Sequence, residues 1–127
     1  MWLLDLYDRW TRLSLRMRGI TSRFATTPSG RLHVYDASGG GELSPVVLLH
    51  GIASSAAPLA PVLARIRPHV RRVLVPEAPG HGFSPRPAER ATARVLGRAV
   101  IDLLSSELRE PAIVYGNSFG GAVALQF

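Results

Sequence analysis

Apolar and polar positions follow two different rhythms along this chain of 127 residues. Over residues 1–18, apolar side chains recur every three or four positions, a spacing that places them along one side of a helix. They are Leu3, Leu6, Tyr7, Trp10, Leu13 and Met17. The pattern predicts an amphipathic helix over residues 1–18 that ends near Gly19.

This helix has two interpretations. In the first, which we prefer, it packs against the rest of the protein through its apolar stripe. In the second, residues 2–17 contact a membrane surface, with Trp and Leu at the headgroup boundary and Arg on anionic lipid. No stretch of the chain approaches the roughly 20 apolar residues that span a bilayer. Because Asp5 and Asp8 interrupt the apolar run, we do not expect a cleaved signal peptide.

Patterns typical of strands follow the first helix. Residues 24–36 surround a Pro-Ser-Gly turn and predict a hairpin. Residues 38–42 contain three consecutive glycines and predict a flexible loop. Three further runs are apolar at every position and predict strands buried on both faces. These runs are residues 46–49, 73–75 and 112–115.

Helical spacing separates the apolar runs. One helix is marked by Leu59, Leu63 and Ile66, with Pro58 in its first turn, and a second is expected over residues 88–108. Strands alternating with helices predict an α/β fold, a mostly parallel sheet with helices on both faces. We therefore divide the chain into an amphipathic helix, residues 1–18, and a core domain, residues 19–127.

Composition excludes several kinds of chemistry. The chain has no cysteine, so it has no disulfide, thiolate metal site or cysteine nucleophile, and a cytoplasmic location is our default expectation. All fifteen basic residues are arginine, which excludes a phosphate-binding or Schiff-base lysine. The net charge of +6 raises the question of nucleic-acid binding, but no known nucleic-acid-binding motif accompanies the arginines, and we expect none. No metal-ligand spacing is present, so neither metal nor cofactor is expected.

A serine lies where the third apolar run passes into a helix. The sequence there is Gly116-Asn117-Ser118-Phe119-Gly120-Gly121. Glycines on both sides of Ser118 remove side chains that would collide across a tight turn. The turn would present the hydroxyl of Ser118 alone, as a nucleophile requires.

A second glycine turn follows the first apolar run, at His50-Gly51. Such a turn exposes backbone N–H groups, which can stabilise the oxyanion that forms when a nucleophile attacks a carbonyl. The candidates for this oxyanion hole are the N–H groups of Ile52 and Phe119. A third motif, Pro-Gly-His-Gly-Phe-Ser at residues 79–84, follows the second apolar run.

In this order and at these separations, the three motifs resemble the α/β-hydrolase fold family over about residues 20–127. The resemblance implies a serine hydrolase that acts on an ester, amide, thioester or activated carbon–carbon bond through an acyl-enzyme on Ser118, with a small ester-like substrate. It makes His50, Gly51, Gly116, Asn117, Gly120 and Gly121 motif-supporting residues. His81 would shape its loop, and Glu77 stands at a structural position where the family usually has Asp. Relatives that open epoxides use Asp as nucleophile, which Ser118 disfavours.

The family's catalytic acid and histidine follow the serine in sequence. None of the nine residues after Ser118 is His, Asp or Glu, and all four histidines precede it. We therefore expect the chain to be the N-terminal part of a longer esterase-like hydrolase, an incomplete α/β-hydrolase fold that is inactive alone. The alternative is a non-catalytic interaction protein on the same scaffold. The sequence leaves the oligomeric state and the substrate open.

Overall fold

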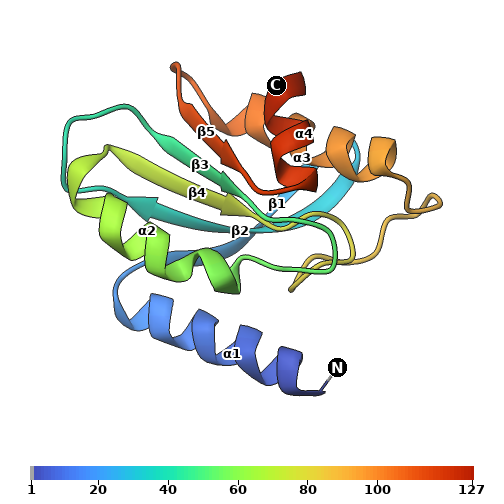
Figure 1. Ribbon diagram of the computed structural model, residues 1–127, viewed down its shortest axis with the longest axis horizontal. Helices are drawn as coiled ribbons and strands as arrows, with labels where there is room; N and C mark the ends of the chain where they lie inside the picture. Colours follow the sequence, from blue (N-terminus) through green and yellow to red (C-terminus); the bar gives the residue numbers. More distant parts are fainter. Residues whose placement is uncertain (1) are drawn as a thin grey trace.

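A mixed five-stranded sheet lies between two pairs of helices in the computed structural model, which describes residues 2–127 (Figure 1). The strands are β1 (Thr21–Thr27), β2 (Gly30–Ser38), β3 (Val46–Leu49), β4 (Arg72–Pro76) and β5 (Ile113–Gly116). The helices are α1 (Trp2–Met17), α2 (Ala60–Ile66), α3 (Ala93–Glu107) and α4 (Phe119–Gln126), with 3-10 turns η1 (Ala57–Leu59) and η2 (Arg67–His69).

The strand order in the sheet is β1-β2-β4-β3-β5. The predicted hairpin is confirmed: β1 and β2 pair antiparallel, with Thr27 opposite Gly30 at the turn. The three apolar runs become β3, β4 and β5, which are mutually parallel. A mostly parallel α/β sheet is therefore confirmed, joined through β2 to an antiparallel edge. The carboxyl ends of β3, β4 and β5 meet at one edge, where ligand sites of such sheets form.

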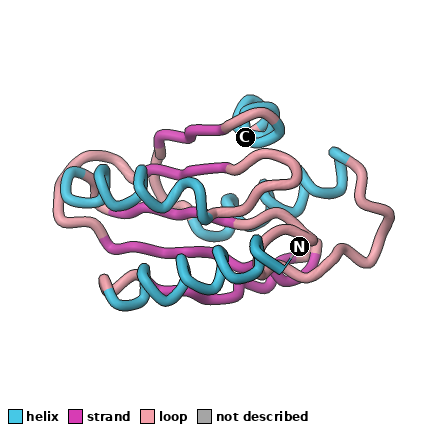
Figure 2. Tube along the Cα trace, turned by 60° about the horizontal axis from the view of Figure 1, so that its bottom comes forward, coloured by secondary structure: helices cyan, strands magenta, loops and turns pink. Residues whose placement is uncertain are grey.

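Successive residues of the parallel strands enter two separate cores. Val46 and Leu48 face the core covered by α1 and α2, whereas Val47 and Leu49 face the core covered by α3 and α4. Figure 2 shows the helices in front of and behind the strands. Because side chains alternate between the faces of a strand, both cores require an unbroken apolar run.

The apolar run at residues 112–115 forms β5, which is only partly buried within residues 2–127. Ile113 and Tyr115 of β5 are 60% and 49% exposed. Within residues 2–127, β5 is the outermost strand and pairs with β3 alone. An apolar run predicts a buried strand, but it does not identify the strand at the edge of the sheet, and an edge strand such as β5 has exposed positions.

Two other boundaries differ from the prediction. The helix expected over residues 88–108 begins at Ala93, because the Oγ1 of Thr92 accepts a hydrogen bond from the N–H of Val95 (3.2 Å) and caps the helix there. Pro58 lies in the 3-10 turn η1, just before α2.

The glycine-rich stretch is not a free loop. The N–H of Gly39 donates to the carbonyl of Arg71 (2.8 Å), and that of Gly41 donates to the carbonyl of Val70 (3.1 Å). A Cβ on Gly39 would lie 1.7 Å from the carbonyl oxygen of Val70. The glycines are needed here for close approach of two backbones rather than for flexibility.

The predicted helix is confirmed as α1 over residues 2–17, with residue 1 outside the described residues, but its orientation is the reverse of the packing we expected. Its only buried residues are Thr11 and Leu15, and the predicted apolar stripe faces outward. The helix is held through its opposite side, where Ser55 Oγ donates to Asp8 Oδ1 (2.7 Å) and the Arg12 guanidinium lies 4.0 Å from the ring centre of Phe83. No helix in residues 2–127 is long and apolar enough to cross a bilayer.

A cluster of four charges ties the hairpin to β4 and α3. Arg23 of β1 and Arg72 of β4 each donate to both Asp36 and Glu107, at 2.8–2.9 Å for the shortest contacts. Burial alone would raise the pKa of Asp36, but hydrogen bonds from Arg72 and Arg23 outweigh it and hold that pKa below its usual value. The two arginines likewise lower the pKa of Glu107.

Candidate active site

Ser118 lies on a sharp turn between β5 and α4, at the carboxyl edge of the sheet. Its backbone angles, φ 53° and ψ −115°, fall in a region that residues other than glycine rarely adopt. In residues 2–127 only Ala53 shares a positive φ among the non-glycine residues. The turn leaves Ser118 exposed, as the sequence motif predicts.

The glycines around Ser118 are required by close backbone contacts. A Cβ on Gly116 would lie 2.2 Å from the carbonyl oxygen of Gly120. A Cβ on Gly120 would lie 2.5 Å from the carbonyl oxygen of Leu49, at the end of β3. The second of these contacts presses the turn against the neighbouring strand, so the glycines fix where Ser118 stands as well as the shape of its turn.

The glycine turn after β3 lies directly against the serine turn. A Cβ on Gly51 would lie 3.3 Å from the carbonyl oxygen of Asn117 and 3.4 Å from the Cβ of Ser118. The N–H of Asn117 donates to the carbonyl of Leu49 (3.1 Å), and the N–H of Gly120 donates to the carbonyl of Asn117 (2.9 Å). The structure thus brings together the two motifs that the sequence places 65 residues apart.

The two N–H groups singled out from the sequence both belong to this junction. Ile52 follows Gly51 and its side chain is exposed, while Phe119 is the first residue of α4. Among residues 2–127, neither N–H has a hydrogen-bond acceptor. The helix start adds a partial positive charge at Phe119, although α4, at eight residues, is short.

Both histidines of the surrounding loops use their two ring nitrogens on backbone groups. The Nδ1–H of His50 donates to the carbonyl of Gly51 (2.8 Å) and its Nε2 accepts from the N–H of Ala78 (3.0 Å). The ring of His81 likewise bonds the carbonyl of Pro79 (2.9 Å) and the N–H of Ala53 (3.2 Å). Burial lowers the pKa of His50. Both rings join the loops after β3 and β4.

The remaining histidines lie elsewhere. His69 belongs to η2, at the amino end of β4, and His33 is fully buried between Ser22 and Glu77. Within residues 2–127, the Ser118 hydroxyl has no hydrogen bond to a histidine or a carboxylate. No group of three or more His, Asp or Glu side chains in the described chain could hold a metal ion.

Glu77 has a larger structural role than the sequence indicated. Its carboxylate is buried and accepts from His33 Nδ1 (2.7 Å), from the N–H of Ala56 (2.9 Å) and from the N–H of Phe83 (3.1 Å). Gly82 must lack a side chain, because its Cβ would lie 1.8 Å from Glu77 Oε2. No sequence pattern links His33 to Glu77, since His33 lies on β2 and Glu77 follows β4, 44 residues further along the chain.

A cavity of about 420 Å³ opens beside the glycine turn. Its walls come from the first half of α1, from residues 53–55 and from the loop at residues 80–82. Asp8 of α1 and His81 of the loop at residues 80–82 both line this cavity. The long N-terminal helix therefore reaches the same edge of the sheet as the serine turn.

Together the sheet order and the serine turn define a hydrolase fold. Residues 46–127 match the family model described as the alpha/beta hydrolase family. The chain belongs to this family, which confirms the family that the motifs indicated.

Relatives within the family have several activities. The chain is 38% identical over 80 residues to pimeloyl-(acyl-carrier protein) methyl ester esterases of Xanthomonas oryzae pv. oryzae and Xanthomonas axonopodis pv. citri. Among solved structures, it resembles an N-acyl homoserine lactonase, AidH (TM-score 0.73, 30% identity over 84% of this chain), and the epoxide hydrolase CorEH (TM-score 0.70, 30% identity over 83%). An alpha/beta hydrolase from Novosphingobium aromaticivorans is 26% identical, with a TM-score of 0.73 over 84% of this chain.

All of these relatives are longer than the present chain. The matched 80 residues are 63% of this chain but 29% of each esterase, and the structural matches cover 36–39% of the solved proteins.

Proposed function

We propose that this protein is a serine hydrolase that cleaves an ester or related acyl bond, with Ser118 as the nucleophile. Ser118 Oγ attacks the carbonyl carbon and gives its proton to a general base. The carbon–oxygen bond to the leaving group then breaks, the base returns the proton to that alcohol, and water later hydrolyses the acyl-enzyme. The observation that carries the proposal is the strained, exposed backbone of Ser118 on a turn closed by glycines.

The N–H groups of Ile52 and Phe119 form the oxyanion hole in this proposal. Donors of this kind work because they are already in place when negative charge develops on the carbonyl oxygen. The contact between Gly51 and the serine turn supports the assignment, as does the lack of an acceptor for either N–H among the described residues.

We propose further that the base and its acid are contributed from outside residues 1–127. His50 and His81 are poor candidates because both ring nitrogens of each are engaged by backbone groups. The greater length of the relatives is consistent with this division. Residues 19–127 would then be the first part of the catalytic domain, and α1 an addition in front of it.

A small ester is the substrate class we favour. Curated relatives are named as methyl ester esterases, and one structural relative as a lactonase. Other structural relatives are epoxide hydrolases. The resemblance associates that chemistry with an Asp nucleophile, and this chain has Ser118 at the position.

The test uses the complete gene product that contains residues 1–127 and a fluorophosphonate probe, which reacts with an activated serine. We expect covalent labelling that Ser118→Ala abolishes. Ser105→Ala is the matched control, because Ser105 is also exposed but lies on α3, and it should label like the parent. A folded complete product that does not label would overturn the proposal and favour the non-catalytic scaffold.

A further inference from the structure

The outward side of α1 carries a continuous apolar stripe. Its six members are between 46% and 81% exposed. They are Trp2, Leu3, Leu6, Trp10, Leu13 and Met17. With 100° between successive residues, these positions fall within one arc of the helix, about 100° wide.

The stripe contributes none of the buried residues of α1. The buried residues Thr11 and Leu15, the Ser55–Asp8 hydrogen bond and the Arg12–Phe83 contact all lie on the other side. Arg67 adds a hydrogen bond to the carbonyl of Arg18 (2.8 Å). A helix that is attached mainly through polar contacts and leaves its large apolar side chains in water is typical of a site that binds another protein or a membrane.

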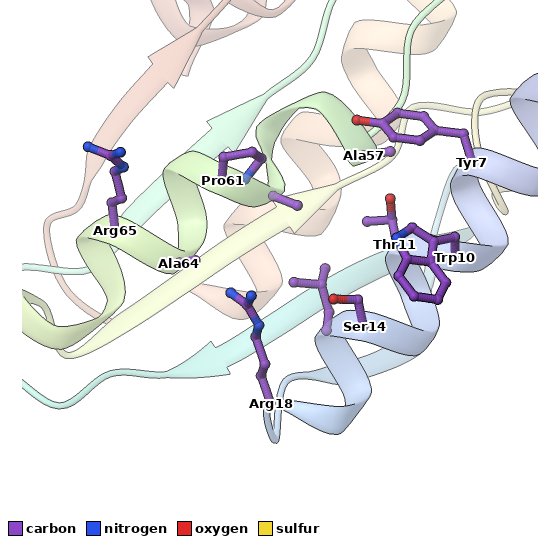
Figure 3. Close-up of a pocket in the computed structure, with 11 residues that line it drawn as sticks. Tyr7, Trp10, Thr11, Ser14, Arg18, Ala57, Pro61, Ala64 and Arg65 are labelled. Atoms are coloured by element: carbon purple, nitrogen blue, oxygen red, sulfur yellow. The ribbon is translucent and has the colours of Figure 1, made fainter.

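The apolar surface continues into a groove between α1 and α2. The groove has a volume of about 390 Å³, and Tyr7 and Trp10 line it opposite the small residues Ala57 and Ala64 (Figure 3). Ala60 also lines the groove. It therefore widens the apolar surface beyond the single helix.

Arginines surround this surface. Arg9 lies three residues after Leu6 and four before Leu13, so it borders the stripe, and Arg16 borders the same side one heptad further on. Arg18 and Arg65 line the groove on the other side. Asp5 is the one exposed carboxylate on α1. The border is therefore positively charged, in a chain whose net charge is +6.

We propose that α1 binds flat on an anionic phospholipid surface, with the stripe at the boundary between headgroups and acyl chains. Trp and Leu prefer this depth, and arginines at the border can contact lipid phosphates. The charge selects the occupant, because a neutral apolar partner would gain nothing from the arginines at the rim. The proposal does not depend on Ser118 or on any catalytic activity.

Tryptophan fluorescence tests this directly, because the only two tryptophans of residues 1–127, Trp2 and Trp10, are both in the stripe. The complete gene product is mixed with vesicles of phosphatidylcholine containing phosphatidylglycerol, and with phosphatidylcholine alone. Where the complete product has further tryptophans, Trp2→Phe and Trp10→Phe identify the signal. We expect a blue shift and co-sedimentation with anionic vesicles, both weakened by salt.

Two sets of variants separate the apolar and ionic contributions. Leu6→Asn with Leu13→Asn should abolish binding, whereas Leu43→Asn, at an exposed leucine away from α1, should leave it unchanged. Arg9→Gln with Arg16→Gln should weaken binding to anionic vesicles on the order of tenfold or more. All variants should retain the parent's unfolding transition, because the substituted side chains are exposed.

Three results would overturn the proposal. The first is a complete product that neither shifts nor sediments with anionic vesicles. The second is a dimer in light scattering that Leu6→Asn with Leu13→Asn converts to a monomer, since the stripe then binds a second copy. The third is Trp2 and Trp10 already shielded from acrylamide without vesicles, since the rest of the chain then covers the stripe.

Discussion

The N–H of Ala78 donates to Nε2 of His50 at 3.0 Å, joining the loops that follow β4 and β3. This bond requires the ring to be neutral at Nε2, because its Nδ1–H is already given to the carbonyl of Gly51. Protonation would place a second ring N–H against the N–H of Ala78. The bond therefore makes the junction of two site loops sensitive to pH.

Stability should fall in weak acid for this reason. Burial lowers the pKa of His50 below the value of 6.5 that it has in an unfolded chain. Between the two pKa values the unfolded state binds more protons, so this contribution is complete above pH 6.5 and is lost as the pH falls through the folded pKa. The free energy of unfolding between pH 7.5 and 5 measures it. His50→Gln should flatten the profile and His69→Gln should not, and an NMR titration midpoint of His50 at or above 6.5 would contradict the argument.

Replacing Glu77 should destabilise the protein strongly. Glu77→Gln removes the charge that faces His33 Nδ1 and forces an amide N–H toward one of the three donors now bound by the carboxylate. Leaving a buried hydrogen-bonding group without its partner costs about 1–3 kcal/mol, and we expect a loss of about 2–3 kcal/mol in chemical denaturation. Glu89→Gln, at an exposed carboxylate, should change the free energy of unfolding by less than about 0.5 kcal/mol. Equal effects of the two variants would exclude the role assigned to Glu77.

Two glycines of similar burial should respond in opposite directions to alanine. A Cβ on Gly120 would lie 2.5 Å from the carbonyl oxygen of Leu49, so Gly120→Ala must displace the serine turn, at a cost of roughly 1–3 kcal/mol. A Cβ on Gly97, inside α3, would make an ordinary contact with Val123 at 3.4 Å. Gly97→Ala should therefore gain up to about 1 kcal/mol in helix propensity. Thermal unfolding of both variants, with fluorophosphonate labelling of each, distinguishes a shifted turn from general destabilisation.

The charge cluster predicts a specific response to acid. The pKa values of Asp36 and Glu107 are lowered in the folded protein, so the stability they contribute is present above about pH 4 and is lost as the pH falls through the folded values. Arg72→Gln should cost about 1–2 kcal/mol at neutral pH and reduce this acid dependence. Arg71→Gln, which removes an exposed bridge to Glu110, should do neither. Unfolding curves of the two variants at pH 7 and pH 3 provide the comparison.

The strand positions could be predicted because burial on both faces of a strand requires an unbroken run of apolar residues. Val46–Leu49 and residues 73–75 are apolar at every position, since each face of the sheet has its own core. The serine turn was also predictable, because the contacts of Gly116 and Gly120 allow no other residue there. The strands depend on composition within a short stretch, and Gly116 contacts Gly120 within the same turn, although Gly120 itself contacts the distant Leu49.

Other features could not be predicted, because they depend on distant partners. The periodicity of α1 reveals a stripe but not whether protein or solvent faces it, and the contacts that decide this, Asp8 with Ser55 and Arg12 with Phe83, join residues far apart in sequence. The same holds for His33 and Glu77. Three consecutive glycines give the same sequence pattern whether they form a free loop or bind the backbone of residues 70 and 71, as Gly39 and Gly41 do.

The two sides of α1 can evolve independently. Thr11, Leu15, Asp8 and Arg12 hold one side of α1 on the protein. We expect substitutions on the other, exposed side to change folding stability little. Single substitutions on this side could therefore raise or lower the affinity of α1 for a lipid surface without compensating changes in the sheet. For protein engineering, the same separation makes the outer side a place where solubility can be adjusted without redesigning the rest of the protein.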